Sequence, residues 1–263
     1  MQAFAYQTPS TVADAVRAAG GDDAKLIAGG QTLLNSMKLG LAAPSMLVDL
    51  GGIAELRGIT VAGGVVTIGA MTTHATVAAS AEVAAAIPAL ADLAGHIGDR
   101  QVRNRGTLGG SLANNDPAAC YPAAVLGLGA TVNTDRRSIA ADDFFLGLYE
   151  TALEPGEVIT SVSFPVPEKA AWQKFKQPAS RFSIVGVFVS TGPKGVRVAV
   201  TGAGAGVFRA SNIEAALSAG WTSAAAAGVT VSADGLSSDL HGSAEYRAAL
   251  IPVLASRAVA AAG

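Results

Sequence analysis

The sequence is poor in cysteine, histidine, aromatic residues and net charge, and each shortage excludes a class of function. One cysteine, Cys120, excludes an intrachain disulfide and a cysteine-held iron–sulfur cluster within this chain. The three histidines, His74, His96 and His241, lie far apart and lack the spacing of metal ligands. The formal net charge of −2 comes without a basic patch, so nucleic acid is not an expected partner.

Long apolar runs are also missing. Charges, glycines and prolines break the alanine-rich stretches before they reach the length of a membrane span, so no membrane span is expected. The first residues, MQAFAY, have neither a basic region nor an apolar run, which predicts no targeting signal and a cytoplasmic location. Half of the 263 residues are hydrophobic but only 5% are aromatic, so we expect a core of small aliphatic side chains.

The pattern along the chain predicts an α+β protein. A strand at 25–27, a helix at 32–38 and a strand at 45–50 form a βαβ-like unit. Gly63-Gly64 between two apolar runs predicts a tight β-hairpin. The other expected elements are helices that open at 8–10 and after Thr72-Thr73, one longer helix from Ser80 to His96, helices at 120–128, 212–219 and 245–259, and strands at 131–133, 158–164, 172–176, 184–190 and 196–201.

Two glycine-rich segments stand far apart in the chain. The first is AGGQTL at 28–33, and the second is QVRNRGTLGGS at 101–111, followed by NNDP at 114–117. Glycines beside small hydroxyl residues let backbone N–H groups approach phosphate oxygens. Two such loops therefore indicate a ligand with two phosphates, although a single glycine pair would also suit a strand-to-helix turn.

In their order and their amino-acid sequence, these segments resemble the FAD-binding medium subunit of the molybdenum hydroxylases, the family of aerobic carbon monoxide dehydrogenase and xanthine dehydrogenase. The likeness extends over nearly the whole chain. It is carried by residues 26–33, 67–73, 97–111 with 114–117, 174–176 with 180–182, and 241–247.

The resemblance implies a two-part FAD-binding domain of the vanillyl-alcohol-oxidase-like type, at 1–55 and 56–167, and a smaller α+β flavoprotein C-terminal domain at 168–263. Pro165-Val166-Pro167 would form the joint. Backbone amides of 28–33 and 107–111 would hold the FAD pyrophosphate. The residues expected at the cofactor are Leu26, Ile27, Ala28, Gly29, Gly30, Gln31, Thr32, Leu33, Ile97, Asn104, Gly106, Thr107, Gly109, Gly110, Ser111, Asp116, Ile159 and Lys176.

Lys176 would place positive charge near the flavin, unless it is a solvent-exposed lysine of a strand. His74 could reach the ribityl region or lie on a surface helix. Asp99 and Arg100 could form a loop salt bridge or touch the cofactor. No residue is expected to be catalytic and none to bind a metal, because the redox chemistry would belong to FAD.

Several positions depart from the family pattern. Cys120 stands where many relatives carry an aspartate that contacts FAD, and Asp116 has a family position of its own. Ser183 lies near a position that is often acidic in relatives. The aromatic residues considered as a shield for the flavin are Trp172, Phe175 and Tyr121.

The resemblance implies an electron-transfer subunit. A large partner subunit would carry a molybdenum cofactor, and a small partner subunit would carry two [2Fe–2S] clusters. Electrons would pass through these clusters to FAD in this chain. The acceptor would be NAD, oxygen or a quinone-type compound, and the assembly a dimer of heterotrimers. Two alternatives are a stand-alone FAD-dependent oxidoreductase and a non-catalytic scaffold subunit that has lost FAD.

Overall fold

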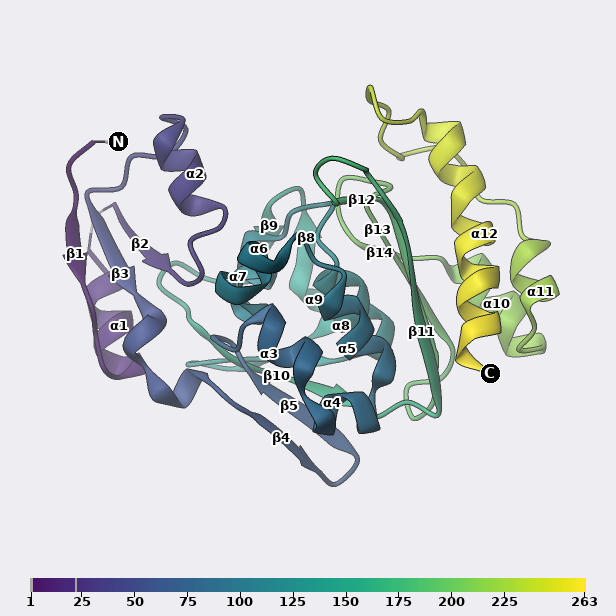
Figure 1. Ribbon diagram of the computed structural model, residues 1–263, viewed down its shortest axis with the longest axis horizontal. Coiled ribbons are helices and arrows are strands. Elements are labelled where there is room, and N and C mark those ends of the chain that lie inside the picture. The colour runs from purple at the N-terminus through teal and green to yellow at the C-terminus, as the bar shows by residue number, and fades with distance from the viewer. Residues whose placement is uncertain (1, 22) are drawn as a thin grey trace.

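The computed structural model describes residues 2–21 and 23–263 as three packed units that follow one another along the chain (Figure 1). The N-terminal unit is a parallel sheet of order β1-β3-β2. Helices α1 and α2 cover its opposite faces, because Val48 packs toward α1 and its neighbour Leu47 packs toward α2. The elements are β1 (Ala5–Gln7), α1 (Val12–Ala19), β2 (Ala24–Ile27), α2 (Leu33–Lys38) and β3 (Met46–Asp49).

The predicted βαβ-like unit is confirmed, since β2 and β3 pair in parallel with α2 between them in sequence. Strand β1 was not predicted, because three residues carry too short a pattern to be read as a strand. Within α2 only Met37 is fully buried, whereas Leu33 and Leu34 are half-buried. Leu33 lines the cleft described below.

The central unit is built on an antiparallel sheet of order β4-β5-β10-β6-β7. Gly63 and Gly64 both have positive φ angles, 57° and 75°, as the predicted tight hairpin between β4 and β5 requires. The strands are β4 (Ile59–Ala62), β5 (Val65–Gly69), β6 (Thr131–Thr134), β7 (Ser138–Ala140) and β10 (Ile159–Pro165). Short helices at Leu50–Gly52 and Ala54–Leu56 connect this unit to β3.

Helices pack against this sheet and share one core with it. They are α3 (His74–Ala79), α4 (Ala81–Ala86), α5 (Pro88–Gly95), α7 (Leu108–Asn114) and α8 (Tyr121–Leu128), with α6 (Arg100–Arg105) and α9 (Ala141–Phe144) at the margin and the hairpin β8 (Phe145–Gly147) and β9 (Glu150–Thr151) beyond.

The prediction of one continuous helix from Ser80 to His96 is wrong. Ile87 leaves the helical conformation with φ −139° and ψ 75°, and Pro88 begins a new helix. A proline disfavours the α conformation in the residue before it, so the chain bends there. The second glycine-rich segment is also helical rather than a loop, since Gly109 and Gly110 lie in the first turn of α7.

The C-terminal unit is an antiparallel sheet of order β11-β12-β13-β14, with helices packed against one face (Figure 1). Its other face contributes Trp172 and Phe188 to the central core. The buried guanidinium of Arg197 donates from Nε to Leu126 O at 2.8 Å, which ties the two units together. The elements are β11 (Lys169–Lys176), β12 (Ser183–Thr191), β13 (Arg197–Thr201), β14 (Phe208–Arg209), α10 (Ser211–Ala219), α11 (Ser223–Ala227) and α12 (Ala244–Ala262).

Within residues 2–21 and 23–263, no helix has the length and apolar character needed to cross a bilayer. In the same part of the chain, no group of three or more histidine, cysteine or acidic side chains is placed to hold a metal ion.

Candidate functional site

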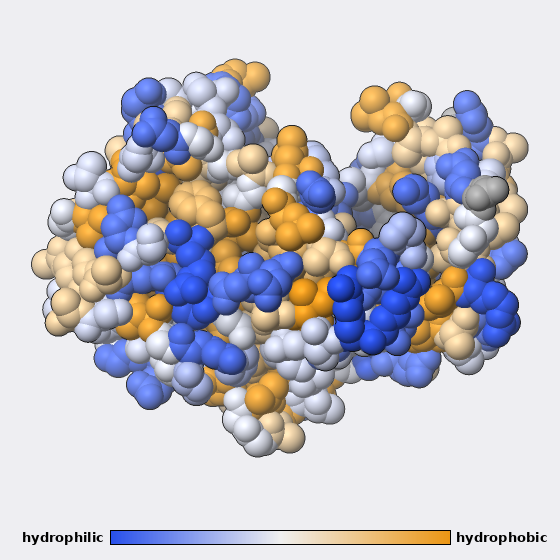
Figure 2. All heavy atoms as spheres, turned by 180° about the vertical axis from the view of Figure 1, so that it is seen from behind, coloured by the Kyte–Doolittle hydropathy of each residue, from blue (hydrophilic) through white to orange (hydrophobic). Residues whose placement is uncertain are grey.

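A cleft of about 680 Å³ runs between the N-terminal unit and the helices of the central unit, and it reaches β11 of the C-terminal unit. Seen from behind, the surface is hollowed between the N-terminal unit and the rest of the molecule (Figure 2). The volume lies within the range of about 300–1,000 Å³ that is typical of sites for small molecules and cofactors.

Sixteen of the eighteen residues predicted at the cofactor line this cleft, although they come from segments more than 60 residues apart. Asn104 and Lys176 do not line it. Asn104 donates to Arg100 O within α6 at 2.7 Å, so its side chain is engaged in its own helix. The residues that line the cleft as expected are Leu26, Ile27, Ala28, Gly29, Gly30, Gln31, Thr32, Leu33, Ile97, Gly106, Thr107, Gly109, Gly110, Ser111, Asp116 and Ile159.

The first glycine-rich segment forms one wall, in the turn from β2 to α2. Gly30 has a φ of 72°, a left-handed conformation that glycine adopts without strain. The backbone N–H groups of residues 30–33 make no hydrogen bond to any residue that the structure describes. They are therefore free to donate to a ligand, as the phosphate-cradle prediction requires.

The second glycine-rich segment differs in this respect. Thr107 caps α7, and the N–H groups behind it are already engaged. Leu108 N donates to Thr72 O, Gly109 N to Ala70 O, Gly110 N to Thr107 Oγ1 and Ser111 N to Thr107 O, at 2.8–3.2 Å. The prediction that backbone amides of 107–111 act as phosphate donors is wrong for these four. What the segment presents to the cleft includes the hydroxyl of Ser111, which lines it.

Close packing explains the glycines that the sequence places in both walls. A Cβ on Gly29 would lie 2.1 Å from Arg105 O, and one on Gly109 would lie 2.6 Å from the Cβ of Ala70. Glycine is required there so that backbone segments can approach each other. Gly109 thus serves the packing of α7 on β5 rather than the approach of a phosphate group.

A lysine that the sequence did not single out lies in the cleft. Lys174 Nζ donates to His96 O at 3.0 Å and lies 3.2 Å from Cys120 Sγ, and both Lys174 and Cys120 line the cleft. Lys176 is exposed, because a β-bulge between Phe175 and Lys176 shifts the register of β11. A bulge of this kind leaves no signal in the alternation of side chains.

His74 is buried rather than placed on a surface helix, with 5% of the residue exposed. It lines the cleft and contacts the ring of Tyr121, with 5.2 Å between ring centroids. Burial, reinforced by the nearby Arg103 charge, lowers the pKa of His74 to about 4. The imidazole is therefore neutral at physiological pH, and its Nδ1 has no partner among the described residues.

Asp99 and Arg103 serve the local structure. Asp99 Oδ1 accepts from Val102 N at 2.8 Å and so caps α6. The carboxylate of Asp99 therefore serves as a helix cap rather than in a salt bridge with Arg100. Arg103 Nη1 donates to Ile97 O at 3.1 Å and to Gly98 O at 3.2 Å. These bonds fix the turn that presents Ile97 to the cleft.

At the far end of the cleft, an ion pair between the buried Glu157 and the exposed Arg137 fixes the start of β10. Glu157 accepts two hydrogen bonds of 3.0 Å from the guanidinium of Arg137, one of 2.7 Å from the Thr134 hydroxyl and one of 2.8 Å from Glu154 N. The Arg137 hydrogen bonds, aided by those from Glu154 and Thr134, lower the pKa of Glu157 to about 2. The pair therefore holds Ile159, two residues further on, against the cleft.

None of the three aromatic residues considered as a flavin shield lines the cleft. Trp172 and Tyr121 are buried in the core, and Phe175 packs edge-on against Tyr246 at 6.2 Å. The aromatic ring that does line the cleft is Phe182, in the loop between β11 and β12, and it is 49% exposed.

The cleft thus combines unpaired amide donors at one end with an apolar floor, a lysine and an exposed ring at the other. Free N–H groups suit phosphate oxygens, and an apolar slot suits a planar ring system. A cofactor that joins a pyrophosphate to a flat ring fits these residues, so the fold and the cleft define the protein as one that binds a dinucleotide-type cofactor.

Comparisons with known proteins agree with this geometry. Residues 2–167 match the family described as the FAD binding domain in molybdopterin dehydrogenase. The nicotine 6-hydroxylase medium subunit of Paenarthrobacter nicotinovorans is 39% identical, over 100% of this chain and 98% of its own length. The carbon monoxide dehydrogenase medium chain of Hydrogenophaga pseudoflava is 36% identical, over 98% of this chain and 96% of its own.

Solved structures show the same fold. A chain of carbon monoxide dehydrogenase from Hydrogenophaga pseudoflava superposes with a TM-score of 0.88 at 35% identity, covering 99% of this chain and 97% of that one. A chain of quinoline 2-oxidoreductase from Pseudomonas putida 86 gives the same TM-score at 32% identity, with the same coverage.

The protein therefore belongs to the family of FAD-binding medium subunits of molybdenum hydroxylases. It is an oxidoreductase subunit with FAD as its cofactor, and its α+β fold is the one that the sequence predicts.

Proposed function

We propose that this chain carries electrons from the iron–sulfur clusters of a partner subunit, through FAD bound in the cleft, to an external acceptor. The observation that carries the proposal is the cleft itself, in which sixteen predicted cofactor positions meet around free backbone donors. The full-length match to medium subunits of hydroxylases and dehydrogenases supports it.

The N–H groups of residues 30–33 would hold the pyrophosphate, since they are unpaired, and the hydroxyl of Ser111 would add a donor from the opposite wall. Each hydrogen bond to a charged oxygen contributes about 1.5–3 kcal/mol. Such a set is sufficient to retain FAD without a covalent bond.

Lys174 would orient the other end of the cofactor. Its ammonium group is anchored on His96 O and Cys120 Sγ, so its charge has a fixed place on the cleft wall. When bound, FAD supplies the redox chemistry. The chain's residues bind the cofactor, orient it and set the charge around it, and none needs to act as an acid or a base.

By the family resemblance, the partners would be a large subunit with a molybdenum cofactor and a small subunit with two [2Fe–2S] clusters, in a dimer of heterotrimers. One of the similar structures, of carbon monoxide dehydrogenase, is described as a Cu,Mo enzyme. A cytoplasmic location and the division at 1–55, 56–167 and 168–263 stay predictions.

Affinity purification of the chain from its native host, followed by flavin and metal analysis, tests the proposal. We expect two partner chains, molybdenum, and about four irons per FAD, as two [2Fe–2S] clusters require. A yellow chain that purifies alone would instead indicate a stand-alone flavoenzyme. A colourless chain would indicate a scaffold subunit, and either result would overturn the proposal.

A further inference from the structure

The segment 241–247 and strand β13 do not line the cofactor cleft, yet a series of hydrogen bonds connects them to it. The connection runs through the turn at 116–119, which lies between α7 and α8. Three residues of this turn line the cleft, and so does Cys120 directly after it. The place of the 116–119 turn therefore sets the shape of the cleft on this side.

Two of the hydrogen bonds that shape the turn are made within it. Ala119 N donates to Asp116 O at 2.9 Å, and Ala118 N donates to Asp116 Oδ1 at 2.8 Å. Both bonds close the turn on itself, as a side-chain oxygen of aspartate commonly does. Neither bond fixes the place of the turn relative to the rest of the cleft.

Thr201, the last residue of β13, supplies a contact from outside the turn. The residue is fully buried, and its Oγ1 donates to Pro117 O at 2.8 Å and to Ala119 O at 2.7 Å, so that the two carbonyls share one hydroxyl proton. The next residue adds a further bond, from Gly202 N to Pro117 O at 2.8 Å. Because a buried carbonyl that loses its donor is costly, these bonds hold the turn against β13.

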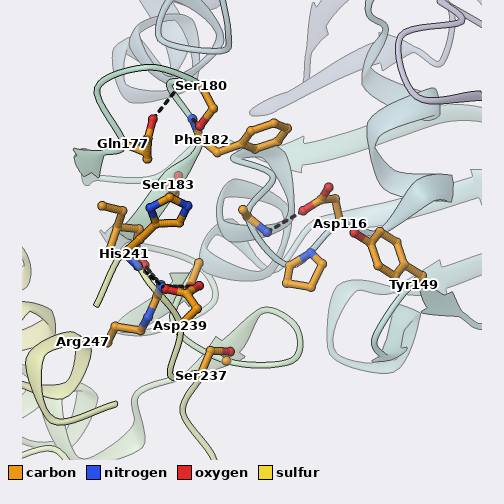
Figure 3. A pocket seen from close by; sticks show the side chains of 15 residues that line it. Asp116, Tyr149, Gln177, Ser180, Phe182, Ser183, Ser237, Asp239, His241 and Arg247 are labelled. Carbon is orange, nitrogen blue, oxygen red and sulfur yellow. Dashed lines mark hydrogen bonds and ion pairs between the residues drawn. The ribbon is translucent and has the colours of Figure 1, made fainter. Parts of the chain in front are cut away.

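Arg247 of α12 holds Gly202 from the other side. This arginine is buried, and its Nη1 donates to Gly202 O at 2.7 Å and to Ile184 O at 2.6 Å. Its Nη2 donates to both carboxylate oxygens of Asp239 at 2.8 Å. Figure 3 shows the Asp239–Arg247 pair and Asp116 of the turn on opposite sides of a cavity of about 320 Å³ that adjoins the cleft. The start of α12 therefore supports the end of β13, which in turn supports the 116–119 turn.

We propose that Thr201 is a positioning residue for the cofactor site, and that its hydroxyl fixes the 116–119 turn in the place that cofactor binding requires. Thr201 does not line the cleft, so it acts on the cofactor only through the turn. The inference rests on the proposed function, since it requires FAD in the cleft. It also gives the segment 241–247 a task, because Arg247 supports the residue that follows Thr201.

Fluorescence titration of the full chain with FAD tests the proposal. Thr201→Val removes the hydroxyl but keeps the shape and the preference for a strand. We expect the FAD dissociation constant of this variant to rise by about three- to tenfold, because the turn loses the donor that both carbonyls share. Thr201→Ser keeps the hydroxyl and should bind FAD as the parent does. Thr201→Ala adds no methyl group against the turn, so it carries the same test if valine does not fit.

Ser190→Ala is the matched control. Ser190 is also buried, lies in the neighbouring strand β12, and donates to Gly127 O of α8 at 2.7 Å. Its loss removes one buried hydroxyl bond between the same two units without touching the turn. Both Ser190→Ala and Thr201→Val should lower the urea midpoint of unfolding, whereas the FAD dissociation constant should rise in Thr201→Val alone.

Hydrogen–deuterium exchange of the FAD-free chains gives a readout that does not depend on the cofactor. The amides of Ala118 and Ala119 should exchange faster in Thr201→Val than in the parent, and at the parental rate in Ser190→Ala. Equal FAD dissociation constants in Thr201→Val and Ser190→Ala, or failure of Thr201→Ser to restore binding, would overturn the proposal, as would parental exchange at these two amides in Thr201→Val. A parent chain that retains no FAD would instead contradict the proposed function, and the exchange measurement would still decide the role of Thr201.

Discussion

At Gly29, the backbone of one wall of the cofactor cleft packs directly against the backbone of the other wall. A Cβ there would lie 2.1 Å from Arg105 O, 2.7 Å from Arg105 C and 2.8 Å from Gly106 Cα. Favourable contact between heavy atoms needs about 3.5 Å or more, so the overlap is larger than an ångström. All three neighbours are backbone atoms, which cannot rotate away as a side chain would.

In Gly29→Ala, the segment before α7 must therefore move away from the first glycine-rich segment. Overpacking of this kind costs about 1–3 kcal/mol, so the free energy of unfolding of the flavin-free chain should fall by that amount. The FAD dissociation constant should rise by about tenfold or more, because both walls shift. Urea unfolding and flavin fluorescence titration measure the two effects.

Gly220→Ala is the matched control for this substitution. Its new Cβ would have no atom within 4 Å, and its φ of −173° is an extended conformation open to any residue. It should leave both quantities unchanged. A Gly29→Ala chain with parental unfolding and parental FAD affinity would refute the argument that glycine is needed here for backbone contact.

The remaining predictions concern charges at the cleft. Lys174→Met removes the bonds to His96 O and Cys120, so the FAD dissociation constant should rise by roughly three- to tenfold. The matched Lys176→Met should leave it unchanged, and equal effects would contradict the assignment of Lys174. Because the pKa of His74 is depressed in the folded chain, the unfolded chain binds more protons than the folded chain between pH 6.5 and about 4. The free energy of unfolding should therefore fall as the pH falls through that window. Urea unfolding of His74→Phe should show a weaker dependence of this free energy on pH. The depressed pKa of Glu157 stabilises the fold above pH 4.5, and this contribution should be lost as the pH falls towards about 2. Glu157→Gln should remove that dependence of the free energy of unfolding on pH. An unchanged pH dependence in this variant would show that the ion pair with Arg137 does not persist in solution.

The sequence predicted the fold well where a pattern is local. The strand–helix–strand order before residue 50 and the Gly63-Gly64 hairpin follow from apolar spacing and from turn residues. Pro88 was also visible in the sequence, and a correct reading of it would have ended the helix at Ile87. The short strands β1, β8 and β9 form only because tertiary pairing selects them.

The site was predictable as a set of segments but not as a set of contacts. The glycine-rich sequences of 28–33 and 101–111 indicated the two walls of the cofactor cleft. It could not show that the amides behind Thr107 are engaged, since their partners Ala70 and Thr72 come from a separate turn. Nor could it distinguish Lys174 from Lys176, because the β-bulge that separates their environments depends on the pairing of β11 with β12.

Hydrogen–deuterium exchange of the full chain with and without FAD tests the central claim most directly. The amides of residues 30–33 are unpaired, so they should exchange quickly without FAD and become protected when it binds. Those of 108–111 are already paired and should be protected in both states. Unchanged exchange at 30–33 on addition of saturating FAD, together with new protection elsewhere, would contradict the assignment of this cleft and of its first glycine-rich wall.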